Sequence, residues 1–147
     1  MGSFSNSTLQ QIRQSLLSQY HKANITLIVN LFGSSQLPVS TNQQASSCAL
    51  SLKLFLQDYG FDGANLDFRD RAAVTSGAAL PWLTEFLLAM GNDHKISITV
   101  EAALLDLQLG PDLVALEKAL GVRIPFWVIR HSSTSYLQLY QGGIASV

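Results

Sequence analysis

The chain has 147 residues, of which 48% are hydrophobic and 13% are charged, so it is long enough for one well-packed domain and short for two. A net charge of −1 without a basic run argues against a nucleic-acid partner, whose phosphates need a cluster of Lys and Arg. No apolar run reaches the roughly 18 residues of a membrane span. We therefore expect one soluble domain over residues 1–147, either secreted or cytoplasmic.

Helix and strand patterns alternate along the chain as four helix-then-strand units. The predicted helices cover about residues 8–20, 43–59, 80–90 and 111–120, and the predicted strands cover residues 26–32, 64–68, 95–101 and 135–141. Residues 126–129 are either a fifth short strand or a buried connector. Alternating helices and strands imply parallel pairing with right-handed crossovers, so we expect an α/β fold.

Metal and cofactor sites are not indicated by the sequence. Cys48 is the only cysteine, which excludes an internal disulfide and a cysteine-based zinc cluster. His21, His94 and His131 are widely separated, and no pair has the ligand spacing of a helix or hairpin. Glycine-rich phosphate loops are absent as well. We expect neither a metal nor a cofactor.

The second predicted strand carries polar side chains along one face. Asn65 and Asp67 alternate with apolar residues, and Arg69 continues the polar face by the period-two rule. An amide, a carboxylate and a guanidinium on one buried strand are unfavourable unless they pair with one another or meet a ligand. This strand is therefore either a binding site or an ion-pair network that fills the interior.

The segment from Asp62 to Arg69 resembles the signature of glycoside hydrolase family 18, the chitinases and their relatives, which runs Asp-Gly-x-Asp-x-Asp-x-Glu. Asp62, Gly63 and Asp67 match this signature, and Asn65 replaces an aspartate. Arg69 stands where the family places the glutamate that protonates the glycosidic oxygen. Arginine is protonated at all accessible pH values and is no proton donor near neutrality. The resemblance therefore implies a pseudoenzyme without a catalytic residue.

The resemblance extends along the order of the strands. Residues 26–33, 96–102 and 137–141 resemble the neighbouring barrel strands of the family, and Tyr140 matches a tyrosine that contacts the N-acetyl group of the sugar. Gln141 departs from the Asn or Asp that the family has there. On this mapping the chain is half of a TIM-type barrel, because a full barrel takes around 250 residues. We expect dimerisation to complete the half-barrel; an open flavodoxin-like parallel sheet is the alternative.

The resemblance implies a non-catalytic chitinase-like protein that binds N-acetylglucosamine-containing glycans at the C-terminal ends of its strands. The candidate ligand-binding residues are Asp62, Asn65, Asp67, Arg69, Glu101, Gln138 and Tyr140. One alternative is a protein-interaction or immunomodulatory protein, with a receptor as partner and no sugar site. A second alternative is a residual glycoside hydrolase that uses Glu101 or Asp70. For Trp82 and Trp127, whose neighbours are apolar, we expect core burial rather than stacking on sugar rings.

Overall fold

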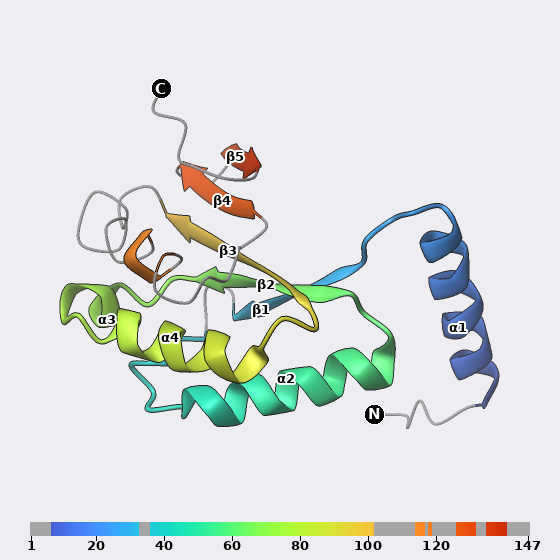
Figure 1. The fold of residues 1–147 in the computed structure, drawn as a ribbon, viewed down its shortest axis with the longest axis horizontal. Coiled ribbons are helices and arrows are strands. Elements are labelled where there is room, and N and C mark those ends of the chain that lie inside the picture. The colour runs from blue at the N-terminus through green and yellow to red at the C-terminus, as the bar shows by residue number, and fades with distance from the viewer. Residues whose placement is uncertain are drawn as a thin grey trace.

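The protein has an α/β architecture built on one five-stranded sheet with the strand order β1-β2-β3-β4-β5 (Figure 1). This computed structural model describes residues 7–32, 36–101, 114–116, 118, 126–131 and 135–140. The strands are β1 (Ile28–Phe32), β2 (Gly63–Phe68), β3 (Lys95–Glu101), β4 (Phe126–His131) and β5 (Ser135–Tyr140). The first four strands are parallel, and β5 runs antiparallel to β4.

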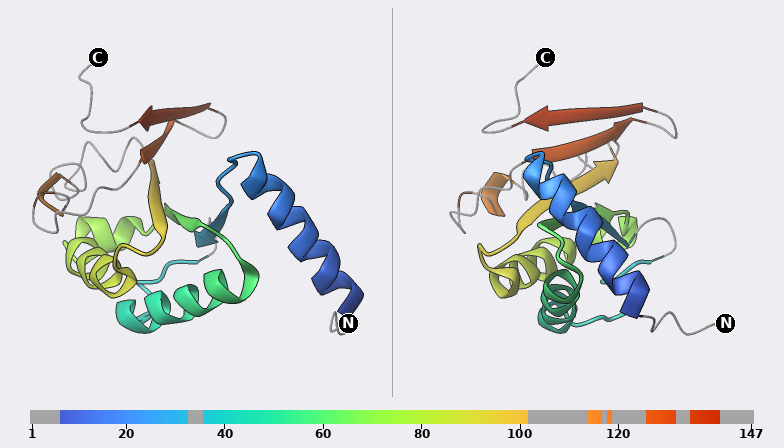
Figure 2. Two further views of the ribbon diagram at one scale, coloured as in Figure 1. Left: turned by 45° about the vertical axis from the view of Figure 1, so that its right-hand side comes forward. Right: turned by 90° about the vertical axis from the view of Figure 1, so that its right-hand side faces the viewer.

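Two helices, α2 (Ala45–Tyr59) and α4 (Ala79–Met90), pack side by side against one face of this sheet (Figures 1 and 2). A short helix, α3 (Arg71–Thr75), precedes α4. The first helix, α1 (Ser7–Lys22), projects to one side of the body (Figure 2). Among the described residues, no helix combines the length and the apolar character needed to cross a lipid bilayer.

The core lies between the sheet and the helices α2 and α4. Period-two alternation places Ala64, Leu66 and Phe68 of β2 on the helix-covered face, and each of them is fully buried. The β3 strand and the two helices supply the other large core residues, which include Leu52, Leu56, Leu83, Phe86, Leu87, Met90, Ile96, Ile98 and Val100. The Trp82 ring stacks on Phe86 at a centroid distance of 5.3 Å. Trp82 is buried at 8% exposure, as the sequence predicted.

Two glycines set how α2 leads into β2. Gly60 ends α2 in the left-handed region, with φ 72°, and its N–H bonds the carbonyl of Leu56. Gly63 opens β2 where it approaches β3 so closely that a Cβ atom would lie 1.9 Å from the carbonyl oxygen of Lys95. Glycine at position 63 is therefore required by packing, independently of any role in a signature.

The sheet is open, with β1 and β5 at its edges, and it does not close into a barrel within the described residues. This agrees with the alternative prediction of an open parallel sheet. The strands nevertheless follow one another sequentially, whereas a flavodoxin-like sheet has the order 2-1-3-4-5. Sequential right-handed crossovers place successive helices on the same face, which is where α2 and α4 lie.

The C-terminal strands differ from the predicted four-unit pattern. The fourth parallel strand is β4, which covers the segment that the sequence left open between a strand and a connector. Residues 135–141 were predicted as the parallel strand of the fourth unit, and this was wrong, because β5 pairs with β4 as an antiparallel hairpin. Only three residues separate β4 from β5, which suffices for a hairpin and is too short for a parallel crossover.

Candidate functional site

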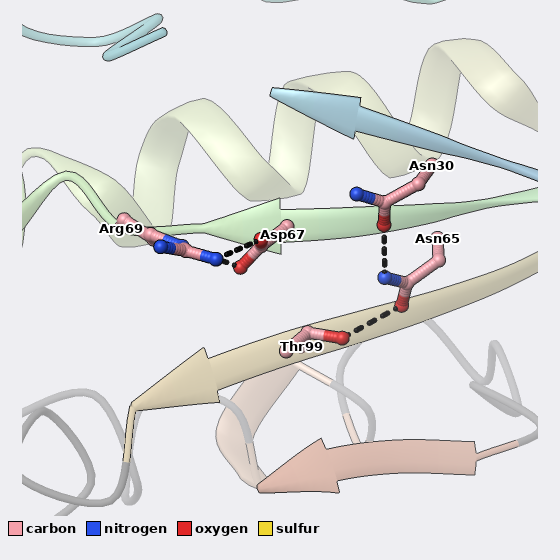
Figure 3. A network of polar contacts seen from close by, with 5 residues as sticks. All are labelled: Asn30, Asn65, Asp67, Arg69 and Thr99. Carbon is pink, nitrogen blue, oxygen red and sulfur yellow. Dashed lines mark hydrogen bonds and ion pairs between the residues drawn. The ribbon is translucent and has the colours of Figure 1, made fainter. Parts of the chain in front are cut away.

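The face of the sheet opposite the helices carries a continuous row of polar side chains (Figure 3). Register places Asn30 of β1, Asn65 of β2 and Ser97 of β3 side by side. Asn65 Nδ2 donates to Asn30 Oδ1 at 2.6 Å, and Asn65 Oδ1 accepts from Ser97 Oγ at 2.8 Å and from Thr99 Oγ1 at 3.0 Å. One amide thus connects three strands.

An ion pair lies beside this row, at the C-terminal end of β2. Arg69 Nε donates to Asp67 Oδ1 at 2.9 Å and Arg69 Nη2 donates to Oδ2 at 2.6 Å, a bidentate arrangement (Figure 3). The side chains of Arg69 and Asp67 are 21% and 11% exposed, respectively, so the pair is largely withdrawn from water. The guanidinium compensates the carboxylate charge that β2 would otherwise bury alone.

Asp70 follows the pair and connects the turn at Ser40 to the start of α3, at the same end of the sheet. Its Oδ2 accepts from the Ser40 N–H at 2.8 Å, its Oδ1 accepts from Ser40 Oγ, and it caps α3 by accepting from the Ala73 N–H at 3.2 Å. Burial acts to raise the pKa of Asp70, but the hydrogen bonds from Ser40 and Ala73 outweigh it and hold the pKa below its usual value. Both carboxylate oxygens are engaged in holding the backbone.

Asp62 lies at the opposite, N-terminal end of β2, away from Asp67 and Arg69. Its Oδ2 accepts from the Leu27 N–H at 2.7 Å and is 3.1 Å from His21 Nε2. Its backbone N–H donates to the carbonyl of Leu27, just before β1, and its carbonyl accepts from the N–H of Lys95 at the start of β3. Asp62 therefore fastens the start of β2 between β1 and β3, and the predicted cluster is divided between the two ends of one strand.

Three predicted site residues, Glu101, Gln138 and Tyr140, are placed by strand register alone. Glu101 is opposite Arg130 at the end of β3. Gln138 is opposite Val128, which is in turn opposite Thr99, so Gln138 stands in the sheet row that contains Asp67 and Thr99. Tyr140 is opposite Phe126 at the far end of β5. Gln141 lies outside the described residues.

Asn30, Ser97 and Thr99 belong to the polar face and were not among the predicted site residues. The signal for Ser97 and Thr99 is the period-two alternation of β3, in which they interleave with buried Ile96 and Ile98. The sequence shows that alternation but not which strands are neighbours. The register supplies this, because it aligns Ser97 with Asn65 and Thr99 with Asp67.

The chemistry available on this face is hydrogen bonding by amides and hydroxyls beside one neutralised ion pair. Among the side chains that the structure describes there, Asp67 is the one carboxylate, and it is bound by Arg69. In the same part of the chain, no three His, Cys, Asp or Glu side chains gather in a way that would hold a metal ion. Comparison of the chain with protein-family models, with curated proteins and with solved structures gave no match.

Proposed function

We propose that the protein is a non-catalytic relative of glycoside hydrolase family 18 that binds N-acetylglucosamine-containing glycans on the polar face of its sheet. The observation that carries the proposal is the bidentate Asp67–Arg69 pair at the C-terminal end of a parallel strand. Ligands of open α/β sheets bind outside the carboxyl ends of the strands, which is where this pair lies.

The residue types on this face suit a sugar ligand. Amide and hydroxyl side chains such as Asn65 and Thr99 both donate and accept, as sugar hydroxyls and N-acetyl groups do. Arg69 carries a planar guanidinium whose charge is balanced by Asp67. A neutral polar surface of this kind binds uncharged glycans without leaving a buried charge unpaired.

The proposal excludes hydrolysis, because substrate-assisted cleavage requires an acid at the position of Arg69. Guanidinium groups do not release a proton near neutrality. Asp70 is no substitute, since Ser40 and Ala73 occupy its carboxylate and its lowered pKa keeps it ionised. The residual-hydrolase alternative predicts turnover of a chromogenic chitobioside, and we expect none.

The half-barrel is the corresponding proposal for the fold. Sequential parallel strands with helices on one face are the arrangement of consecutive units in a (β/α) barrel, which supports it. The antiparallel β5 occupies the edge where a further parallel strand of a barrel would pair. In this proposal the hairpin of β4 and β5 ends the barrel-like series.

Calorimetric titration with N-acetylchitotriose tests the sugar proposal through two aspartates of the same strand region. We expect Asp67→Asn to weaken binding at least tenfold, while Asp62→Asn, at the other end of β2, leaves it within twofold. Equal effects of the two changes, or no binding to the natural chain, would overturn the proposal. Silence on a glycan array would favour the protein-interaction alternative.

A further inference from the structure

An apolar groove lies on the helix side of the edge strand β1. Val29 and Leu31 of β1 form one wall, and Cys48, Ser51 and Phe55 of α2 contribute to the other, around a volume of about 600 Å³. Parallel sheets bury both faces of their strands, and helices normally cover the apolar side. Here α2 and α4 cover β2 and β3, whereas Val29 and Leu31 are only half-buried.

The helix α1 does not fill this groove, because one of its faces is anchored at the C-terminal end of α2. Arg13 Nη2 donates to the Asp58 carbonyl at 3.2 Å, and the Arg13 guanidinium lies 4.4 Å from the centroid of the Tyr59 ring. Leu17 packs against Gly60, and His21 pairs with Asp62. The contacts recur every four residues, so they define one side of the helix.

A second face of α1 is apolar and is left largely exposed by the residues that the structure describes. Ile12, Leu16 and Tyr20 are 51%, 47% and 44% exposed, and they also recur every four residues. Each lies one position before an anchoring residue, which turns this stripe by about 100° from the anchored face. The stripe is therefore available while α1 keeps all its contacts with its own body.

The stripe and the groove match in length and in charge. From Ile12 to Tyr20 the helix rises about 12 Å, and from Cys48 to Phe55 the groove wall on α2 runs about 10 Å. None of the residues that line the groove is charged, and neither are the three residues of the stripe. Contact between them would bury apolar surface without burying an unpaired charge.

We propose that the groove between β1 and α2 receives the Ile12-Leu16-Tyr20 stripe of α1 from a second copy of this chain, in a reciprocal two-fold dimer. The helix of the same copy is held on the end of α2 by Arg13, Leu17 and His21. Helix-in-groove contacts of this kind use anchors at helical spacing. Reciprocal exchange closes the assembly at two copies.

Reciprocity also matters for the size of the interface. Stable interfaces bury about 800 Å² on each partner. The area that one helix face buries in one groove is small compared with that value. Exchange in both directions adds a second contact, because each copy then both donates a helix and has its groove occupied. The interface lies on the helix side of the sheet, so it is independent of the polar face on which the sugar proposal rests.

Disulfide trapping tests this inference, because Cys48 is the only cysteine of the chain and lines the groove. Three variants each combine Cys48→Ser with one new cysteine, at Ile12, Leu16 or Tyr20. Each variant carries a mass tag and is mixed with the natural chain under mild oxidation. We expect at least one of these variants to give a yield of mixed covalent dimer ten times that of a control variant that combines Cys48→Ser with Leu88→Cys. Leu88 is the matched control, since it is 62% exposed on α4, outside the groove.

The yield of mixed dimer decides between a second copy and the same chain as the source of the helix. If no stripe variant exceeds the Leu88 control, the groove does not receive this helix from another copy. If Leu16→Cys with the natural Cys48 forms a disulfide only within one chain, α1 closes on its own body, and the inference is wrong.

Light scattering at micromolar concentration gives a second readout that needs no cysteine. We expect the natural chain to be a dimer, and Leu16→Asp to raise its dissociation constant at least tenfold. The matched change Leu50→Asp, at a residue that is 60% exposed on α2 and outside the lining of the groove, should leave the dimer intact. A monomeric natural chain, or equal effects of the two changes, would overturn the inference. Sugar binding by the natural chain and by Leu16→Asp, measured in parallel, separates its failure from that of the sugar proposal.

Discussion

The two faces of β2 are stabilised in different ways, although they belong to the same six residues. On the helix side, Leu66 and Phe68 are fully buried among apolar side chains, so their contribution grows with the area removed from water. On the opposite side, Asn65 and Asp67 are stabilised by specific partners on neighbouring strands or two residues away. The apolar face tolerates changes that conserve volume, whereas the polar face depends on each partner being present.

Gly63→Ala should have the largest effect, because both faces exist only while β2 and β3 lie close together. The added Cβ would meet the backbone of Lys95, which cannot rotate away as a side chain can. We expect a loss of at least about 4 kcal/mol in the free energy of unfolding, measured with urea. Gly77→Ala is the control, since it has open space but φ of 75° and should lose only about 1–2 kcal/mol. Equal losses in the two variants would mean that β3 moves away from position 63 and accommodates the added Cβ atom.

Phe68→Ala tests the apolar face. Phe68 is fully buried, with 0% of its surface exposed to water, so its removal should leave a cavity and cost about 3–5 kcal/mol in the free energy of unfolding. Leu54→Ala serves as the control, because Leu54 is 54% exposed on α2 and should lose less than about 1 kcal/mol. Denaturant melting of both variants measures the difference. Similar losses would show that the helix-covered face is not the core.

Arg69→Leu tests the polar face by removing the partner of Asp67. Breaking a fully buried pair costs about 3–5 kcal/mol, but both side chains keep some contact with water, so we expect about 2 kcal/mol. The double change with Asp67→Asn should recover part of this loss. In a double-mutant cycle measured by urea melting, a coupling energy below about 0.5 kcal/mol would show that the two side chains do not interact.

The Asp70 carboxylate should give a smaller effect that depends on pH. Because hydrogen bonds lower its pKa in the folded state, its contribution is present in full above the unfolded pKa of about 3.9 and is lost as the pH falls through the folded value. Asp70→Asn should cost about 1–2 kcal/mol at neutral pH, and the difference should shrink on acidification below about pH 4. If the difference in unfolding free energy between the natural chain and Asp70→Asn stays constant with pH, the ionised Asp70 carboxylate is not the source of the stabilisation.

Much of the architecture follows from local sequence patterns. The alternation around Leu66 predicted a strand with one apolar and one polar face, and the structure has both. The pairing of Asp67 with Arg69 was also predictable, because residues two apart in a strand share a face. The burial of Trp82 followed from its apolar neighbours. These features depend on residues that are close along the chain.

Other features were decided by contacts between distant segments, which no local pattern encodes. The amide of Asn65 meets Asn30, Ser97 and Thr99 only because parallel pairing in one register aligns three strands. Asp62 is committed to the start of the sheet because its carboxylate accepts from the Leu27 N–H, 35 residues away in the sequence. The position of α1 was likewise set by Arg13 and Tyr59, far apart in sequence. The sequence by itself determined the apolar and polar faces of β2 and β3, and the tertiary structure decided which neighbouring strands those faces meet.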